Sequence, residues 1–299
     1  MSAASARTNL VIDRLVVIGV GLIGGSFALA LRGAGAVKRV TGVGRTRKNL
    51  QAALDRGVLD EAADDAAEAV RDADLVLIAT PVGQMPEVMA QIAPALSERA
   101  VITDGGSTKQ DVIAYARRFL PAHFERFVPA HPIAGTEKSG ATAAFAELYR
   151  DRNVILAPQP ETGKWALEVV RRAWEACGAR IVELDAARHD AIFAAVSHLP
   201  HVVAFALLSM LAKRDDAATL LGFSGGGLRD TVRIAGSSPE MWRDICVGNR
   251  EALLAVLDDY VEELELARAA LENADGTELE AMFDRARTAR RRWLLKEQV

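Results

Sequence analysis

The chain has 299 residues, half of them apolar, which is enough for two hydrophobic cores of moderate size. Its 36 basic and 40 acidic residues give a formal charge of −4, so composition excludes an overall cationic field that would hold a nucleic acid or an anionic membrane surface. Apolar runs such as residues 202–208 look too short to cross a bilayer, and the start MSAASARTNL lacks the apolar segment of a secretory signal, so we expect a cytoplasmic protein.

Short β-branched runs alternate with Ala-rich helical segments between residues 14 and 184. This alternation predicts an α/β fold built on a doubly wound, mostly parallel sheet. After Asp185 the strand pattern stops, and helical stretches follow at residues 186–213, 239–273 and 277–296, with a glycine-rich break at 222–227. We therefore predict two domains, a sheet domain over residues 1–184 and an all-helical domain over residues 185–299.

Two amphipathic segments end the chain, at residues 253–272 and 279–295. Such helices often pack against the same helices of a second subunit, so we predict a homodimer formed through the helical domain. An ordinary bundle within one chain would give the same pattern, and the sequence leaves that alternative open.

The first predicted strand runs into GVGLIGGS, which places Gly19, Gly21 and Gly24 at a turn from strand to helix. In this context Gly19 permits the tight turn, Gly21 lets the backbone approach a pyrophosphate, and Gly24 lets helix and strand pack closely. The N–H groups that open the helix, including those of Leu22 and Ile23, would face the phosphates. These residues predict a Rossmann-type dinucleotide site, although a purely structural turn would use the same glycines.

The second strand ends at Gly44, where dinucleotide-binding folds usually carry an acidic residue that contacts the adenosine ribose. Arg45 and Thr46 follow. Without a carboxylate to repel a 2′-phosphate, a guanidinium and a hydroxyl can bind it, so we predict a preference for NADP with NAD also possible. A solvated basic loop that tolerates both cofactors is the alternative.

The strand LVLIAT ends at Thr80 and Pro81, on the carboxyl edge of the predicted sheet, where ligands of such folds bind. We predict that both residues line the cofactor crevice. A capping turn for the helix that starts near Pro86 would explain the same pattern.

Two further strand ends bring polar side chains to this edge, DGGSTK with Ser107 and HPIAGTEKSG with His131, Thr136 and Glu137. A dehydrogenase that oxidises an alcohol needs a base for the hydroxyl proton, and an imidazole suits that task. We therefore predict that His131 is catalytic, with Ser107 orienting the ring or holding the nicotinamide carboxamide.

The helical half contributes SHLPH, with His198 and His201, and a later segment with Arg233 and Trp242. The histidine pair lacks carboxylate or thiol partners, and Cys177 and Cys246 lack ligand spacing, so no metal site is predicted. Arg233 lies among apolar neighbours and would suit a fixed anion such as a substrate carboxylate, with a structural salt bridge as the alternative.

The motifs GVGLIGGS, DGGSTK, HPIAGTEKSG, SHLPH and RDTVRIAGSSPEMWRDI together resemble the prephenate/arogenate (cyclohexadienyl) dehydrogenase family of tyrosine biosynthesis, in order and spacing over about residues 15–250. The resemblance implies a Rossmann-type domain, a helical dimerisation domain and an NAD(P)-dependent oxidative decarboxylation of prephenate, or of arogenate. Many family members carry an acidic residue where Gly44 stands, so NAD use does not follow from it.

The resemblance also implies roles for single residues. His131 would accept the hydrogen bond of the C4 hydroxyl with support from Ser107, and Arg233 would bind a substrate carboxylate with His201 nearby. Further contacts with the substrate are implied for Thr136 and Glu137 at the entrance and for Trp242. Another two-domain NADP-dependent dehydrogenase and a non-catalytic nucleotide sensor stay as alternatives, although neither needs this combination of His131, Ser107 and Arg233.

Overall fold

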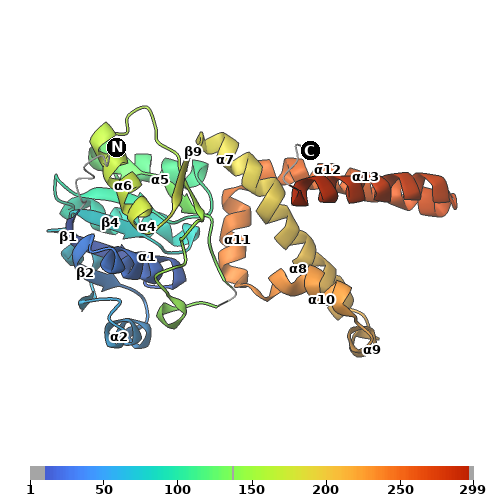
Figure 1. Cartoon of the computed structure of the whole chain (residues 1–299), viewed down its shortest axis with the longest axis horizontal. Coiled ribbons are helices and arrows are strands. Elements are labelled where there is room, and N and C mark those ends of the chain that lie inside the picture. The colour runs from blue at the N-terminus through green and yellow to red at the C-terminus, as the bar shows by residue number, and fades with distance from the viewer. Residues whose placement is uncertain (1–10, 137, 296–299) are drawn as a thin grey trace, which may run out of the picture. The chain divides into compact units, whose positions relative to one another are not determined.

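The computed structural model of the protein describes residues 11–136 and 138–295 (Figure 1). It comprises two compact units, Met1–Arg250 and Glu251–Val299. Among the described residues, the first unit contains every strand and the helices up to α11, and the second contains α13 and nearly all of α12. The boundary predicted between residues 184 and 185 stays a prediction.

A six-stranded sheet in the order β3-β2-β1-β4-β5-β6 forms the centre of the first unit, and all its neighbouring strands are parallel. The strands are β1 (Ile12–Ile18), β2 (Val37–Val43), β3 (Glu61–Ala63), β4 (Leu75–Ile78), β5 (Val101–Asp104) and β6 (Phe127–Val128). The reversal of strand order on either side of β1 confirms the predicted doubly wound, Rossmann-type sheet.

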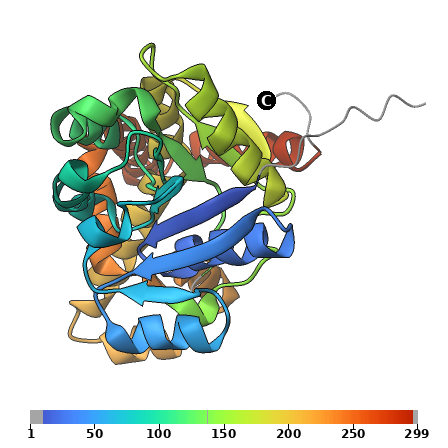
Figure 2. The same ribbon diagram turned by 90° about the vertical axis from the view of Figure 1, so that its left-hand side faces the viewer.

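Successive residues of the central strands point to opposite faces, and each face has its own apolar core. Figure 2 shows helices on both sides of the sheet. Leu15 and Val17 pack with helices α1 (Leu22–Gly33), α2 (Arg47–Asp55) and α6 (Lys164–Ala176). Val16 and Ile18 pack with α3 (Ala66–Ala69), α4 (Met85–Ile92) and α5 (Gln110–Phe119). The short helices η1 (Val82–Gln84), η2 (Ala93–Ala95), η3 (Pro121–Arg126) and η4 (Ala141–Ala143) complete the loops.

A second, three-stranded sheet carries His131. It has the order β7-β8-β9, with β7 (Ala130–Pro132) antiparallel to β8 (Asn153–Leu156) and β8 parallel to β9 (Arg180–Glu183). The strand-forming run RFVPA at residues 126–130 predicts a single strand, but the structure divides this region between the two sheets at Pro129. Proline has no N–H for a strand ladder, which favours such a break. His131 therefore pairs with Ile155 rather than continuing the central sheet.

Beyond β9 the unit is helical. Helix α7 (Ala186–Phe193), a π-helical turn (Ala194–His198) and α8 (Leu199–Ala212) form one helix of 27 residues, visible in Figure 1. By length and composition this helix could cross a membrane, so the expectation that every apolar run is too short is wrong here. The runs look short because His198, Pro200 and His201 interrupt them, yet the helix continues through all three residues.

The remaining helices are α9 (Ala217–Gly222), α10 (Gly226–Val232), η6 (Arg233–Gly236), α11 (Pro239–Gly248), α12 (Arg250–Glu272) and α13 (Gly276–Leu294). Two sequence expectations differ. The predicted glycine-rich break at 222–227 is shorter, because α10 already begins at Gly226. The helix predicted over 239–273 is interrupted at Asn249. The Asn249 side chain is buried and donates a hydrogen bond to the backbone oxygen of Asp190.

Candidate active site

The glycine turn lies between β1 and α1, at the carboxyl edge of the central sheet. Gly19 has a φ of 99°, and a Cβ atom there would lie 2.5 Å from the backbone oxygen of Ala79. A Cβ atom at Gly24 would lie 2.4 Å from the oxygen of Gly19. Only glycine fits these two positions without a backbone shift. Gly21, by contrast, has open space where its side chain would be, so its backbone is accessible to a ligand.

The surroundings of this turn fit a dinucleotide. Helix α1 has twelve residues, no acidic residue in its first turn and no side chain that caps its first N–H groups, among them those of Leu22 and Ile23. The hydroxyl oxygen of Thr80 is buried without a hydrogen-bond partner, and the backbone nitrogen of Thr80 would lie 2.8 Å from a Cβ atom at Gly19. Pro81 follows and caps η1. Anion-binding N–H groups and an unsatisfied hydroxyl thus lie at one turn.

The loop after β2 exposes Gly44, Arg45 and Thr46. Thr46 is the N-cap residue of α2, but its hydroxyl makes no capping hydrogen bond. The Arg45 guanidinium lies 3.7 Å from the carboxylate of Glu240, which also accepts a hydrogen bond of 3.3 Å from the Gln84 amide. A carboxylate of α11 therefore faces the basic loop, which sequence reasoning did not foresee.

His131 and the glycine turn meet near Gly105. A Cβ atom at Gly105 would lie 3.1 Å from the Ile23 side chain, which belongs to α1, and 4.0 Å from the ring of Pro132. Because Pro132 is the neighbour of His131 in β7, the strand that carries the imidazole passes beside the start of α1. The structure thus brings the predicted base close to the predicted cofactor turn.

The half-buried imidazole of His131 has its Nδ1 atom 2.8 Å from Nε2 of His189. Its ring also packs edge to face on Phe193, with centroids 4.8 Å apart. Burial, and then the electrostatic influence of His189, Lys109 and His198, hold the pKa of His131 well below its ordinary value. The ring is therefore neutral at physiological pH, as a proton acceptor must be.

A buried ion pair holds the backbone beside His131. Lys109 and Asp104 are fully buried and paired with each other. Lys109 Nζ donates to the oxygen of Ala130 at 2.7 Å, and Asp104 Oδ1 accepts from the nitrogen of Ala130 at 2.9 Å. Both backbone groups of the residue before His131 are thus fixed, which limits movement of the imidazole.

Ser107 lies half-buried in the loop between β5 and α5. Among the residues that the structure describes, no hydrogen bond joins Ser107 to His131, and the partner of Nδ1 of that ring is His189. The assignment of Ser107 to the catalytic site stays a prediction, as do both of its suggested roles, orienting the His131 ring and holding the nicotinamide carboxamide.

The helical part of the unit contributes a cluster around Trp242. The buried Trp242 ring stacks on His201, and His198 lies edge to face on the same indole at 6.1 Å. The Asn249 amide is 3.0 Å from Nδ1 of His198 and donates to the oxygen of Asp190 at 2.8 Å. Burial lowers the pKa of His198 to about 4, so its ring is neutral.

Arg233 begins η6 with its side chain exposed. Burial is the largest cause that lowers the pKa of His201, and the charge of Arg233 lowers it further, which places the guanidinium near that imidazole. Thr136 is exposed and its hydroxyl accepts from the backbone nitrogen of Lys138 at 3.2 Å. Glu137 lies outside the described residues. The roles of Arg233, His201, Trp242 and Thr136 in substrate binding stay predictions.

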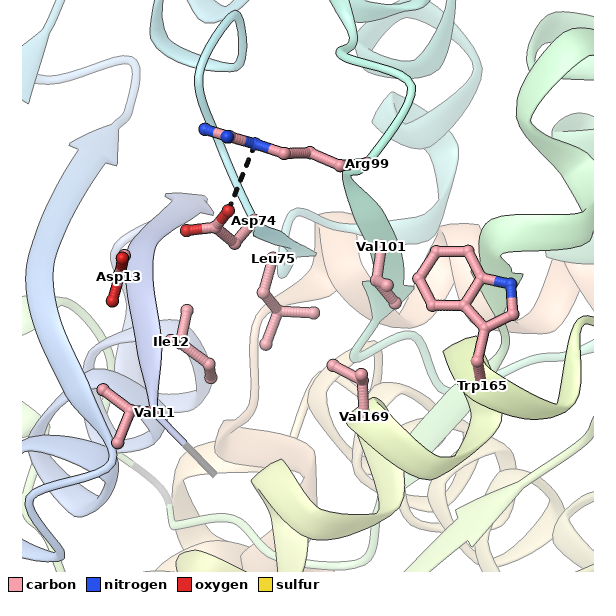
Figure 3. A pocket seen from close by; sticks show the side chains of 9 residues that line it. All are labelled: Val11, Ile12, Asp13, Asp74, Leu75, Arg99, Val101, Trp165 and Val169. Carbon is pink, nitrogen blue, oxygen red and sulfur yellow. Dashed lines mark ion pairs between the residues drawn. The ribbon is translucent and has the colours of Figure 1, made fainter. Parts of the chain in front are cut away.

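A pocket also occurs at the opposite, amino edge of the sheet, where Figure 3 shows an ion pair between Asp74 and Arg99, 3.3 Å apart. The pocket lies at the first residues of three strands, Ile12, Leu75 and Val101. Its other lining residues are Val11, Asp13, Trp165 and Val169. Ligands of doubly wound sheets bind at the carboxyl edge, so we assign this pocket no part in the site.

Comparisons with known proteins agree with this geometry. Residues 27–183 match the family description "Prephenate dehydrogenase, nucleotide-binding domain", and residues 185–285 match "Prephenate dehydrogenase, dimerization domain". The chain is 39% identical over 284 residues to the cyclohexadienyl dehydrogenase of Zymomonas mobilis, covering 94% of this chain and 96% of that protein. It is 37% identical to the prephenate dehydrogenase of Bacillus subtilis, over 94% and 76% of the two chains.

A solved structure shows the same likeness. The prephenate dehydrogenase of A. aeolicus, in complex with hydroxyphenyl propionate and NAD+, superposes with a TM-score of 0.85 at 33% identity, covering 94% of this chain and 99% of that one. The fold, the two matched domains and the relatives over nearly the full length all agree. The chain belongs to the prephenate dehydrogenase family of NAD(P)-dependent oxidoreductases.

Proposed function

We propose that this chain catalyses the oxidative decarboxylation of prephenate to 4-hydroxyphenylpyruvate. A hydride leaves C4 of the cyclohexadiene ring, the ring carboxylate departs as CO2, and the electron pair of the broken C–C bond enters the ring and makes it aromatic. Arogenate, with an amino group in place of the side-chain keto group, would yield tyrosine by the same steps. The observation that carries the proposal is the neutral His131 beside the glycine turn of α1.

His131 would hold the C4 hydroxyl proton while the hydride leaves, and it would return that proton to the phenolic oxygen after CO2 departs. Arg233 and His201 would bind a substrate carboxylate, because a guanidinium makes strong charge-assisted hydrogen bonds to that group. The Gly19 to Gly24 turn, the N–H groups of α1 and Thr80 would hold the dinucleotide. NAD(P), when bound, supplies the nicotinamide that accepts the hydride.

Within this function, NADP is the cofactor that the loop after β2 would favour. Gly44 offers no carboxylate at the position where many family members have one. Arg45 and the Thr46 hydroxyl, which makes no capping hydrogen bond to α2, could both bind a 2′-phosphate. Glu240 opposes this preference, since its carboxylate lies 3.7 Å from Arg45 and would repel the same phosphate. NAD therefore stays a possible second cofactor.

The working form that we propose is a homodimer in the cytoplasm, joined through the helical part of the chain. The family description for residues 185–285 is a dimerization domain. In α12 and α13, large apolar side chains are exposed in the single chain, including Val261, Leu264, Leu271 and Phe283. Only 22% of the most apolar window of the helix Ala186–Ala212 is buried, so this helix also has apolar surface that a second subunit would cover.

A steady-state experiment tests the function. Purified protein is assayed with prephenate and with arogenate, each with NAD and with NADP, while the absorbance of the reduced nicotinamide is followed. Formation of reduced cofactor and 4-hydroxyphenylpyruvate from prephenate is the expected result. Cofactor binding without turnover of either substrate would overturn the proposal and favour a nucleotide-sensing role. Sedimentation of the 32.1 kDa chain as a monomer at micromolar concentration would contradict the dimer.

A further inference from the structure

Two titratable residues in succession, His189 and Asp190, lie near the start of the long helix, in α7, and the reaction as described above uses neither. Both are buried. They extend a chain of hydrogen bonds inward from the predicted base. Nδ1 of His131 lies 2.8 Å from Nε2 of His189, and Nδ1 of His189 lies 2.8 Å from Oδ1 of Asp190. The chain joins β7 to α7, across 58 positions of the sequence.

The inner end of this chain can only accept hydrogen bonds. Oδ1 of Asp190 also accepts from the backbone nitrogen of Lys109 at 2.8 Å, and Oδ2 accepts from that of Gln110 at 2.9 Å. Burial alone would raise the pKa of Asp190, but the hydrogen bonds from His189, Gln110 and Lys109 outweigh it and leave the pKa below its ordinary value. Because Asp190 is a carboxylate, the hydrogen between it and His189 must reside on Nδ1 of His189.

The direction of the next hydrogen bond follows from this one. Burial holds the pKa of His189 below its ordinary value, even though Asp190 acts in the opposite direction. A neutral ring with its hydrogen on Nδ1 has a lone pair on Nε2. His131 must therefore donate from Nδ1, which leaves its own lone pair on Nε2. The other charged or titratable groups that act on these two rings are Lys109, Asp104 and His198.

We infer that His189 and Asp190 are positioning residues that fix the tautomer of His131, so that its Nε2 atom is the one that accepts the substrate hydroxyl proton. The inference rests on the proposed function. It follows the general rule that the hydrogen bond made by one ring nitrogen of a histidine decides which form the other takes. Without an acceptor at Nδ1, the His131 ring would be divided between two tautomers and free to rotate.

Asp190 has a second task, since it accepts from the first N–H groups of α5, so its loss would also loosen that helix. The sharper test therefore changes His189. In His189→Gln the side-chain oxygen can accept from His131 as Nε2 does now, whereas the side chain of His189→Leu cannot accept at all. The two variants differ in the acceptor and both remove the imidazole.

We expect His189→Leu to lower kcat by about 10²–10⁴, the range associated with a positioned acid-base group held in the wrong form. His189→Gln should keep kcat within about tenfold of the unchanged protein, a loss of no more than about 1.4 kcal/mol in barrier height. The KM for prephenate and the affinity for NADP should change little in either. His123→Leu, at a half-buried histidine bound to Ala93 and Arg126, is the matched control and should leave kcat unchanged. Equal kcat values for the two His189 variants, whether both high or both low, would overturn the inference.

A measurement that does not depend on turnover completes the test. In protein labelled with 15N-histidine, the ring nitrogen shifts of His131 distinguish a protonated from an unprotonated nitrogen. We expect the hydrogen on Nδ1 in the unchanged protein and a mixture of tautomers in His189→Leu. A hydrogen on Nε2 in the unchanged protein would overturn the inference. If the protein showed this tautomer but did not oxidise prephenate or arogenate, the proposed function would fail and the hydrogen-bond chain would stand.

Discussion

The imidazole of His201 lies flat against the indole of Trp242, with ring centroids 3.5 Å apart and 19° between the planes. The contact joins α8 to α11 and holds His201 near Arg233. A stacked pair of this kind contributes about 0.5–1.5 kcal/mol beyond the area it buries, so its loss should be measurable in substrate binding.

Replacing Trp242 with Leu should therefore raise the KM for prephenate by about threefold to tenfold, because His201 loses the surface that orients it. The KM for the cofactor should stay unchanged. Steady-state kinetics with each substrate varied in turn measures both. Trp165→Leu, at a tryptophan on α6 that is 48% exposed, serves as control. An equal rise in both Michaelis constants would instead indicate general disruption of the fold.

Glu240 should oppose NADP through its position beside Arg45. In Glu240→Gln the repulsion of a 2′-phosphate is removed and the guanidinium is released, so the KM for NADP should fall by about twofold to fivefold, as suits an exposed pair. The KM for NAD should not change. The comparison variant is Glu272→Gln, which removes an exposed carboxylate from the ion pair with Arg268 on α12. A parallel change for both cofactors would show that Glu240 does not discriminate between them.

The pH dependence of kcat/KM should follow the lowered pKa of His131. A base acts when it is neutral, and burial together with the electrostatic influence of His189, Lys109 and His198 moves the pKa of this imidazole well below 6.5. Activity should therefore persist from pH 8 through pH 6.5 and fall only in more acidic solution. A profile of kcat/KM in a constant ionic-strength buffer series measures this. Half-maximal activity at or above pH 6.5 would contradict the predicted protonation.

Stability should depend on His198 in acid. The pKa of His198 is lowered from 6.5 to about 4 by burial, so between these values the unfolded chain binds a proton that the folded chain does not. The free energy of unfolding is therefore unaffected above pH 6.5 and declines as the pH falls toward 4, by about 3 kcal/mol from this residue alone. Urea unfolding at several pH values measures the slope. His198→Gln should flatten it, and an unchanged slope in that variant would assign the acid sensitivity to other groups.

Two glycines of one turn should respond differently to alanine. Gly24→Ala should lower the melting temperature, because the new methyl group would lie 2.4 Å from the oxygen of Gly19. Gly21→Ala should leave the melting temperature nearly unchanged but weaken NADP binding, since its methyl group would project into the open space beside the helix start. Thermal melting and cofactor titration measure the two effects. Gly33→Ala, at the end of the same helix and also in open space, should change neither.

The fold could be predicted from the sequence where patterns are local. The β-branched runs of β1, β2, β4 and β5 and the helical spacing between them predict the parallel sheet. Strand β3 was missed because three residues, Glu61–Ala63, give no readable alternation. The division at Pro129 was missed because a run of apolar residues does not say which of two sheets will take each half.

The site could be predicted from the sequence only where its residues form a short continuous motif. In the sequence, His131 comes after a strand-forming run and is followed by a proline and then by a glycine, which is a local signal. His189 and Asp190 look like an ordinary polar pair on a helix, and their partner lies 58 positions away. The only feature of the sequence that indicates this role is that His189 and Asp190 are adjacent, because the carboxylate of Asp190 can then accept a hydrogen bond from the imidazole of His189. The Arg45–Glu240 contact joins still more distant segments and left no sign in the sequence.

The π-helical turn at Ala194–His198 sets the angular phase between two halves of one helix. His201 follows His189 by twelve positions, which in a regular α-helix would separate them by about 120° around the axis. One additional residue in a π turn removes about 100° of that rotation, so the two imidazoles come to nearly the same side. If the same twelve positions formed a regular α-helix instead, every side chain of the site would remain in the sequence and yet the Trp242 cluster would turn away from the His131 chain.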